Sequence, residues 1–292
     1  MPQVTLEQAT IKYQVLGPED SAYPPVLFIH GLCVDHRLWS EVAESLARSG
    51  FRCVMPTLPL GAHTIPVDDT VTLSFAGLAT LIRDLMDALE LTDVTLVGSD
   101  TGGGLCQVVV DYYPDHVGRM VLANCDAFEK FPPFPFTMTL QLMRGPMSIR
   151  TMFTAMRLLR PLRHSMFGYD LLTDEYADLT KAWFEPCRND ERICRDLAIL
   201  ARQISVSDLV GVSTRLHQFN KPVVLAWGQQ DRLFTPRLGR RLADVFPNST
   251  LIEIPNSRTF VPLDDPKSVI EAITRVNASP HLDVAAGTDA KA

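Results

Sequence analysis

The chain has 292 residues, which is enough for one large α/β domain with an inserted piece or for two modest domains. Hydrophobic residues make up 46% and charged residues 21%, as in a globular enzyme with a sizeable core. The formal net charge of −7 argues against a nucleic-acid partner.

The N-terminal stretch MPQVTLEQATIKYQVLG has neither the basic start nor the apolar centre of a signal peptide. No later apolar stretch is both long enough and free enough of charge to span a membrane, so we expect a cytoplasmic protein without stable membrane insertion. The six cysteines lie far apart, with no CxxC pair, which favours buried thiols over a metal site. We predict no metal and no cofactor, and the sequence leaves the oligomeric state open.

Short β-rich runs alternate with amphipathic stretches over residues 1–127, as in a mostly parallel sheet covered by helices. The pattern predicts a hairpin over 4–17 and a buried strand over 25–31. The next stretch, 36–50, predicts a helix with Leu38, Val42 and Leu46 on one face. Further strands are predicted over 51–59, 94–98 and 117–126, with helices over 73–91 and 104–114.

Residues 128–212 have a helical pattern only, and we predict that they form a lid inserted into the α/β core. Within this lid Ile149, Met152, Phe153, Met156 and Leu159 recur at helical spacing. The alternation resumes over 213–278, with strands predicted near 221–228 and 249–256 and helices over 237–246 and 266–276. Residues 279–292 are small and polar, so a frayed tail is expected.

The stretch VTLVGSDTGGGLCQ, residues 94–107, raises the question of which side chain is reactive. A sharp strand-to-helix turn exposes one residue when its neighbours two positions away are glycines. Asp100 has Gly98 and Gly102 at those positions, whereas Ser99 would need glycines where valine and threonine stand. The register therefore predicts Asp100 as the exposed residue. An Asp that only caps the following helix is the alternative.

Three motifs, GSDTGG (98–103), HGLCVDHRLW (30–39) and LAWGQQDRLFTP (225–236), give a family resemblance over about residues 10–275. The chain resembles the α/β-hydrolase superfamily, specifically the aspartate-nucleophile branch of haloalkane dehalogenases and epoxide hydrolases. The resemblance implies an α/β-hydrolase fold with a helical lid. It also implies that Asp100 attacks a saturated carbon to form an ester, with the backbone N–H groups of Leu32 and Thr101 as oxyanion donors.

The resembled family carries a histidine after its last strand, at the position where this chain has Thr259. That histidine activates the water that hydrolyses the ester, and threonine cannot accept a proton at neutral pH. Either His63 or His30 supplies the base instead, or Asp100 acts as a general base without forming an ester, or the chain keeps a pocket without turnover.

Two further carboxylates are candidates for the site. Asp231 matches the acid that orients the family histidine, and an ion pair with Arg258 is its alternative role. Asp126, at the end of the strand before the lid, occupies the position where some family members place their acid.

The substrate is expected to be small and hydrophobic. Thr101 and Leu32 stand where dehalogenases of this type carry halide-binding side chains, which disfavours dehalogenation. Tyr169 and Tyr176 lie in the lid, where epoxide hydrolases carry tyrosines that protonate the epoxide oxygen. The lid is also rich in methionine and phenylalanine, a composition typical of an adaptable apolar pocket. Phe134 and Met152 are candidate substrate contacts.

The sequence favours a hydrolase that uses Asp100 as nucleophile or general base on an epoxide, alkyl halide or ester. Because the family histidine is absent, a catalytically silent ligand-binding protein and a non-hydrolytic lyase or cyclase are the alternatives.

Overall fold

The computed structural model describes residues 1–68, 70–71, 73–171 and 176–278. Its centre is an eight-stranded sheet in the order β1-β2-β4-β3-β5-β6-β7-β8. Strand β2 pairs antiparallel with β1 and β4, and all other neighbouring strands are parallel. The strands are β1 (Gln3–Thr5), β2 (Thr10–Leu16), β3 (Val26–Ile29), β4 (Cys53–Thr57), β5 (Val94–Asp100), β6 (Val117–Cys125), β7 (Val223–Gly228) and β8 (Ser249–Ile254).

The described α-helices are α1 (Ser40–Arg48), α2 (Phe75–Ala88), α3 (Thr101–Tyr112), α4 (Phe136–Leu142), α5 (Pro146–Leu158), α6 (Arg160–Arg163), α7 (Ala177–Ala182), α8 (Glu185–Asn189), α9 (Glu191–Gln203), α10 (Ser207–Ser213), α11 (Pro236–Val245), α12 (Val261–Asp264) and α13 (Pro266–Ala278). Short 3₁₀ turns are η1 (His36–Trp39), η2 (Pro114–His116), η3 (Phe128–Lys130) and η4 (Leu216–Gln218).

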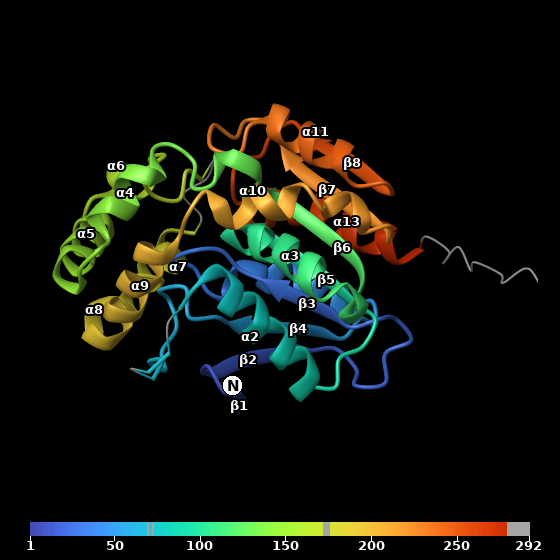
Figure 1. Ribbon diagram of the computed structural model, residues 1–292, viewed down its shortest axis with the longest axis horizontal. Coiled ribbons are helices and arrows are strands. Elements are labelled where there is room, and N and C mark those ends of the chain that lie inside the picture. The colour runs from blue at the N-terminus through green and yellow to red at the C-terminus, as the bar shows by residue number, and fades with distance from the viewer. Residues whose placement is uncertain (69, 72, 172–175, 279–292) are drawn as a thin grey trace, which may run out of the picture.

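The predicted fold class is confirmed, because helices flank a mostly parallel sheet. Helices α2 and α3 pack together on one face of the sheet, and α1 and α13 pack together on the other (Figure 1). The predicted apolar face of the first helical stretch is confirmed, since Leu38, Val42 and Leu46 are all buried. That stretch begins as η1 and continues as α1.

The helices α4 to α10 follow β6 and precede β7, and α4 to α9 lie beside the sheet rather than over its faces (Figure 1). Helix α10 packs on α3 of the core. The boundaries predicted for a separate lid, 128–212, stay a prediction. One detail of its pattern is wrong: α5 ends at Leu158, and Leu159 is exposed, because Pro161 cannot continue the helix. The predicted tail, 279–292, lies outside the described residues.

The carboxyl ends of the parallel strands meet at one edge of the sheet, beside the helices that follow β6. The central strand β5 pairs with β3 through Gly98 and Ile29, and with β6 through Asp100 and Cys125. The segments that follow β3, β5, β6, β7 and β8 therefore converge there. In open α/β sheets ligands bind at this edge.

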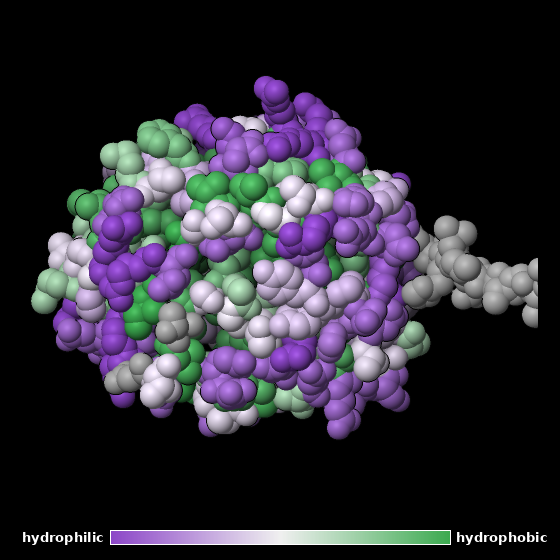
Figure 2. Space-filling view, viewed as in Figure 1, coloured by the Kyte–Doolittle hydropathy of each residue, from purple (hydrophilic) through white to green (hydrophobic). Residues whose placement is uncertain are grey.

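Large apolar side chains are exposed mainly over α4 to α6 and the segments beside them, at the left of Figure 2, and include Phe134, Met138, Leu142, Met147 and Leu158. In the part of the chain that the structure describes, no helix is by itself long and apolar enough to cross a membrane. The consecutive helical segments Glu191–Gln203 and Ser207–Gln218 are together long and apolar enough for a membrane span, but they are bent by 57° relative to each other.

Candidate active site

Asp100 is the residue at the turn from β5 into α3. Its φ and ψ are 55° and −133°, a conformation that is strained for a residue with a side chain and that costs on the order of 1–3 kcal/mol. The turn is tight: a Cβ on Gly102 would overlap with backbone oxygens of β3 and the residue after it, and a Cβ on Gly31 would overlap with the Asp100 carboxylate. Ser99, by contrast, is fully buried.

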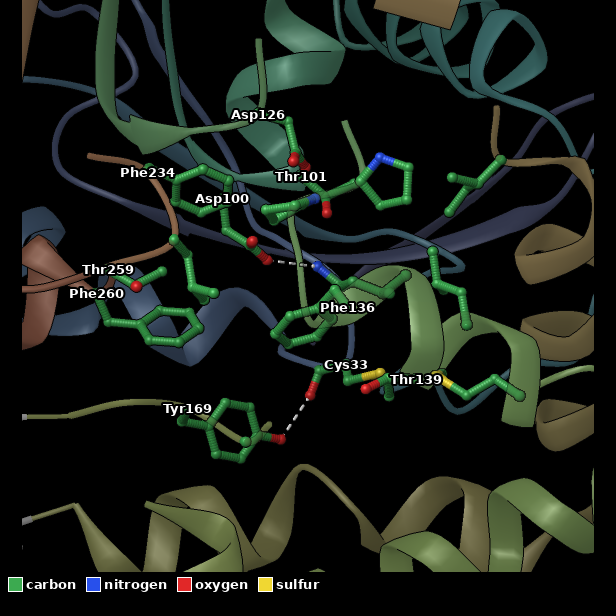
Figure 3. A pocket seen from close by; sticks show the side chains of 18 of the residues that line it. Cys33, Asp100, Thr101, Asp126, Phe136, Thr139, Tyr169, Phe234, Thr259 and Phe260 are labelled. Atoms are coloured by element: carbon green, nitrogen blue, oxygen red, sulfur yellow. Dashed lines mark hydrogen bonds between the residues drawn. The ribbon is translucent and has the colours of Figure 1, made fainter. Parts of the chain in front are cut away.

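The Asp100 carboxylate is hydrogen-bonded to a backbone N–H group at the cavity (Figure 3). Its Oδ2 accepts a hydrogen bond from Leu32 N at 3.1 Å, and the backbone N–H of Thr101 also stabilises the charged form. Burial nevertheless raises the pKa of Asp100 from 3.8 to about 7, because the loss of hydration outweighs these hydrogen bonds and the charge of Asp231 adds repulsion. The N-terminal end of α3 offsets part of this effect.

Asp126 lies at the same strand edge, directly after β6. Its backbone N–H donates to the carbonyl oxygen of Asp100 at 3.3 Å, and its side chain lines the same cavity. The residue is 2% exposed, and its Oδ1 has no hydrogen-bond partner. Burial raises the pKa of Asp126 well above the usual value, and the charge of Asp100 raises it further, while the Thr101 hydroxyl lowers it.

Asp231 is held from three sides behind the cavity wall. Its Oδ1 accepts from the backbone N–H groups of Leu233 and Phe234 at 2.7 and 3.0 Å, and its Oδ2 accepts from Asn124 Nδ2 at 2.8 Å. Burial raises the pKa of Asp231 to about 6 despite these hydrogen bonds. The alternative of an ion pair with Arg258 is wrong, since the guanidinium of Arg258 contacts Asp170 at 3.0 Å.

Thr259 follows β8 and lines the cavity near Asp231. Its buried Oγ1 makes no hydrogen bond of ordinary geometry, yet the hydroxyl is close enough to Asp231 to lower the pKa of that carboxyl. A buried hydroxyl therefore lies near Asp231 after the last strand.

Among the described residues no histidine lines this cavity. The structure corrects the expectation for His63: its Nε2 lies 3.2 Å from Asp196 Oδ2 on α9, its Nδ1 accepts from Gly61 N, and its side chain lines a separate surface pocket. His30 bonds the Gly31 carbonyl oxygen through Nδ1 and accepts from Leu58 N at its Nε2. Burial lowers the pKa of His30 to about 4, so it is a neutral structural residue.

The predicted lid contacts divide into two groups. Tyr169 and Met152 line the cavity, and the Tyr169 hydroxyl donates to the Cys33 carbonyl oxygen at 2.9 Å (Figure 3). Tyr176 is not among the lining residues and its hydroxyl lies 3.5 Å from Glu41 Oε2. Phe134 is 71% exposed and also lies outside the cavity, whereas Phe131 and Phe136 line it.

The cavity itself is apolar and small. Its volume is about 50 Å³, far below the roughly 300–1,000 Å³ of pockets that bind drug-sized ligands. Besides Asp100, Asp126 and Thr101, its wall is mostly aliphatic, aromatic and thioether side chains, among them Leu32, Phe131, Phe136, Leu140, Met143, Met152, Phe153, Met156, Phe234 and Phe260. Such a cavity suits a ligand with few polar atoms.

Sequence reasoning missed two residues that shape the site. Asn124 links β6 to the end of β7, since its Nδ2 also lies 3.2 Å from the Gly228 carbonyl oxygen and its Oδ1 accepts from Gly228 N. A lone amide in the apolar run VGRMVLANCD was the available signal. Cys33 has a φ of 59°, a second strained backbone position beside the carboxylate, and no pattern in the sequence predicts it.

A family model described as the alpha/beta hydrolase fold matches residues 24–266. The chain belongs to the α/β-hydrolase-fold family. This α/β-hydrolase is 26% identical over 269 residues to haloalkane dehalogenase 2 of Mycobacterium tuberculosis, which covers 87% of this chain and 88% of that protein. It is also 26% identical over 240 residues to the 2-hydroxy-6-oxo-6-phenylhexa-2,4-dienoate hydrolase of Burkholderia cepacia, with 79% of each chain covered.

Solved structures of other proteins share this fold. A haloalkane dehalogenase from Bradyrhizobium elkani aligns with a TM-score of 0.76 at 19% identity, over 96% of this α/β-hydrolase and 99% of that chain. The enol-lactonase of Burkholderia xenovorans aligns with a TM-score of 0.71 at 15% identity, over 94% and 99%. Within the described ranges no cluster of histidine, cysteine and carboxylate side chains is arranged to hold a metal ion.

Proposed function

We propose that this chain is a hydrolase in which Asp100 attacks a small apolar electrophile, such as an epoxide, an alkyl halide or an ester. The observation that carries the proposal is the Asp100 carboxylate, held by Leu32 N–H at 3.1 Å at a strained turn and lining a small apolar cavity. A strained backbone is retained where the position of a side chain matters.

The two carboxylate oxygens of Asp100 have different surroundings, which supports a nucleophilic role. Oδ2 accepts from Leu32 N–H, so Oδ1 is the oxygen available for attack on carbon. Attack would produce an ester whose carbonyl oxygen is Oδ2, which already accepts from Leu32 N–H, a donor that would stabilise an oxyanion. Loss of one such donor typically costs about 3–4 kcal/mol of transition-state stabilisation.

The test is a single turnover in water enriched in the heavy oxygen isotope, with propylene oxide and propyl bromide as electrophiles. Intact-protein mass spectrometry is expected to show an ester on Asp100, and after hydrolysis the heavy isotope should be in the Asp100 carboxylate. Label found only in the product would contradict the ester. Asp100→Asn is the matched variant, because it keeps the shape of the side chain and removes the nucleophile.

The rate of ester formation should increase with pH. Attack requires the carboxylate, and burial raises the pKa of Asp100 to about 7, so the rate is expected to level off above about pH 7. A rate that levels off near the usual pKa of a surface aspartate would contradict a buried nucleophile.

A second candidate is proton abstraction by Asp100 without an ester, as in a lyase or cyclase. The pKa near 7 favours it, because a general base works best when its pKa lies near the operating pH. Exchange of substrate hydrogen with deuterated water, with no mass added to the protein, would support this candidate. Ligand binding with neither exchange nor mass change would support a silent binding protein.

A further inference from the structure

We propose that Asp126 performs both proton transfers of the reaction at Asp100. As a carboxylic acid it protonates the oxygen of a strained cyclic ether while the ring opens. As a carboxylate it then takes a proton from the water that hydrolyses the ester. This inference rests on the proposed function, because it assumes an ester on Asp100.

The topology places the two carboxyl groups on neighbouring strands at one cavity. Asp100 ends β5 and pairs with Cys125 of β6, and Asp126 is the next residue along β6. Both side chains line the cavity, and Asp126 is almost fully buried with no partner for Oδ1. A buried oxygen without a partner is unfavourable, and a ligand group or a water molecule at that place would relieve the cost.

Tyr169, Thr259 and Asp231 are occupied or unsuitable for these proton transfers. The Tyr169 hydroxyl donates to the Cys33 carbonyl oxygen, so its proton is not directed at Asp100. The Thr259 hydroxyl cannot accept a proton at neutral pH. The oxygens of Asp231 accept hydrogen bonds from the backbone and from Asn124, outside the lining of the cavity.

The surroundings of the two carboxyl groups give them different protonation states. Leu32 and Thr101 N–H groups stabilise the charge of Asp100, whose pKa is about 7. Burial and the neighbouring charge of Asp100 keep the pKa of Asp126 well above its usual range. Environments that separate the pKa values of paired carboxyl groups typically assign one as nucleophile and the other as acid.

In the first step Oδ1 of Asp100 forms a bond to a ring carbon, and the bond from that carbon to the ring oxygen breaks. The ring oxygen takes the proton of Asp126. The products are a hydroxyalkyl ester of Asp100 and an ionised Asp126.

In the second step a water molecule attacks the ester carbonyl carbon and gives one proton to ionised Asp126. The oxyanion on Oδ2 faces the Leu32 N–H group. When this intermediate collapses, the alkoxide leaves and takes the remaining proton of the added hydroxyl group. The products are a diol, ionised Asp100 and protonated Asp126, so the net reaction is cyclic ether plus water to diol.

This role makes the two classes of electrophile behave differently. A cyclic ether needs the Asp126 proton when its ring opens, so ester formation from it depends on the acid form of Asp126. An alkyl halide releases its halide as an anion, which needs no proton. Loss of the Asp126 proton should therefore slow ester formation from a cyclic ether much more than ester formation from an alkyl halide.

The first experiment uses the unmodified protein. Formation of the esters from propyl bromide and from propylene oxide is followed by mass spectrometry in ordinary and in deuterated water. In deuterated water ester formation from propylene oxide should slow relative to ester formation from propyl bromide, because only the ring opening takes a proton from Asp126. Equal slowing of the two reactions would overturn the role of Asp126. Absence of both esters would instead overturn the proposed function.

The second experiment uses Asp126→Asn, which keeps the shape but cannot supply a proton at neutral pH. Diol formation from propylene oxide should fall by about a hundredfold or more relative to ester formation from propyl bromide, because only the diol pathway uses a proton from Asp126. Asp126→Glu should recover part of the diol formation, and Asp244→Asn, an exposed carboxylate on α11, is the control. Diol formation at the wild-type rate in Asp126→Asn, with ester still formed from the bromide, would overturn the inference.

Discussion

Replacing Asp100 by asparagine is expected to stabilise the folded protein, although it removes the proposed nucleophile. Asn has the same shape and tolerates a positive φ better than most residues, so the turn between β5 and α3 should be retained. The variant should be more stable because it has no carboxylate that must lose its hydration in the folded protein. A stabilising loss of function is typical of a site selected for chemistry rather than for packing.

The magnitude follows from the pKa of Asp100. Burial raises it from 3.8 to about 7 in the folded protein, so the folded state holds its proton over a pH range in which the unfolded chain has lost it. A pKa difference of one unit between the folded and unfolded states corresponds to about 1.4 kcal/mol. The raised pKa of Asp100 therefore lowers the free energy of unfolding by about 4 kcal/mol above pH ~7. The free energy of unfolding of the wild type therefore falls relative to that of the variant as pH rises from about 4 to about 7.

The assay is urea unfolding of wild type and Asp100→Asn at several values between about pH 5 and pH 8. The difference in the free energy of unfolding should be about 1.5 kcal/mol near pH 5 and should grow to about 4 kcal/mol near pH 8. Asp244→Asn, at an exposed position on α11, is the matched control and should show no comparable growth with pH. A variant that is no more stable than wild type near pH 8 would refute the reasoning.

Three other substitutions test the surroundings of the carboxylate. Gly31→Ala would place a Cβ against Asp100 Oδ2, so ester formation measured by mass spectrometry should fall by about a hundredfold or more. The circular dichroism spectrum should be unchanged. An unchanged rate of ester formation would mean that the carboxylate is not held at this position. Thr259→His would add an imidazole near Asp231, and the ester formed from propyl bromide should then hydrolyse about a hundredfold faster. An unchanged rate of hydrolysis would show that the added ring cannot reach the water that attacks the ester. Tyr169→Phe leaves the Cys33 carbonyl oxygen without its donor, and urea unfolding should show a loss of about 1–3 kcal/mol; no loss would indicate that water replaces the hydroxyl.

The sequence alone was sufficient for the order of the elements and for the register of the turn. Alternating apolar runs and amphipathic stretches depend on short-range periodicity, and they predicted the hairpin, the parallel strands and the buried face of the first helical stretch. The spacing of Gly98 and Gly102 around Asp100 reflects steric limits within a few residues of the turn. Such local constraints are visible in a linear sequence.

Tertiary packing decided which distant side chains meet at Asp100. His63 follows a strand whose end faces the site, yet Asp196 of α9, far along the chain, holds its ring in another place. Arg258 is paired with Asp170 rather than Asp231, and Tyr169 is turned toward the Cys33 carbonyl oxygen. The direction of a side chain at the end of a strand depends on what packs against it from other elements, and a single sequence does not contain those contacts explicitly. The unpartnered carboxyl oxygen of Asp126 in the same cavity became apparent for that reason only in three dimensions.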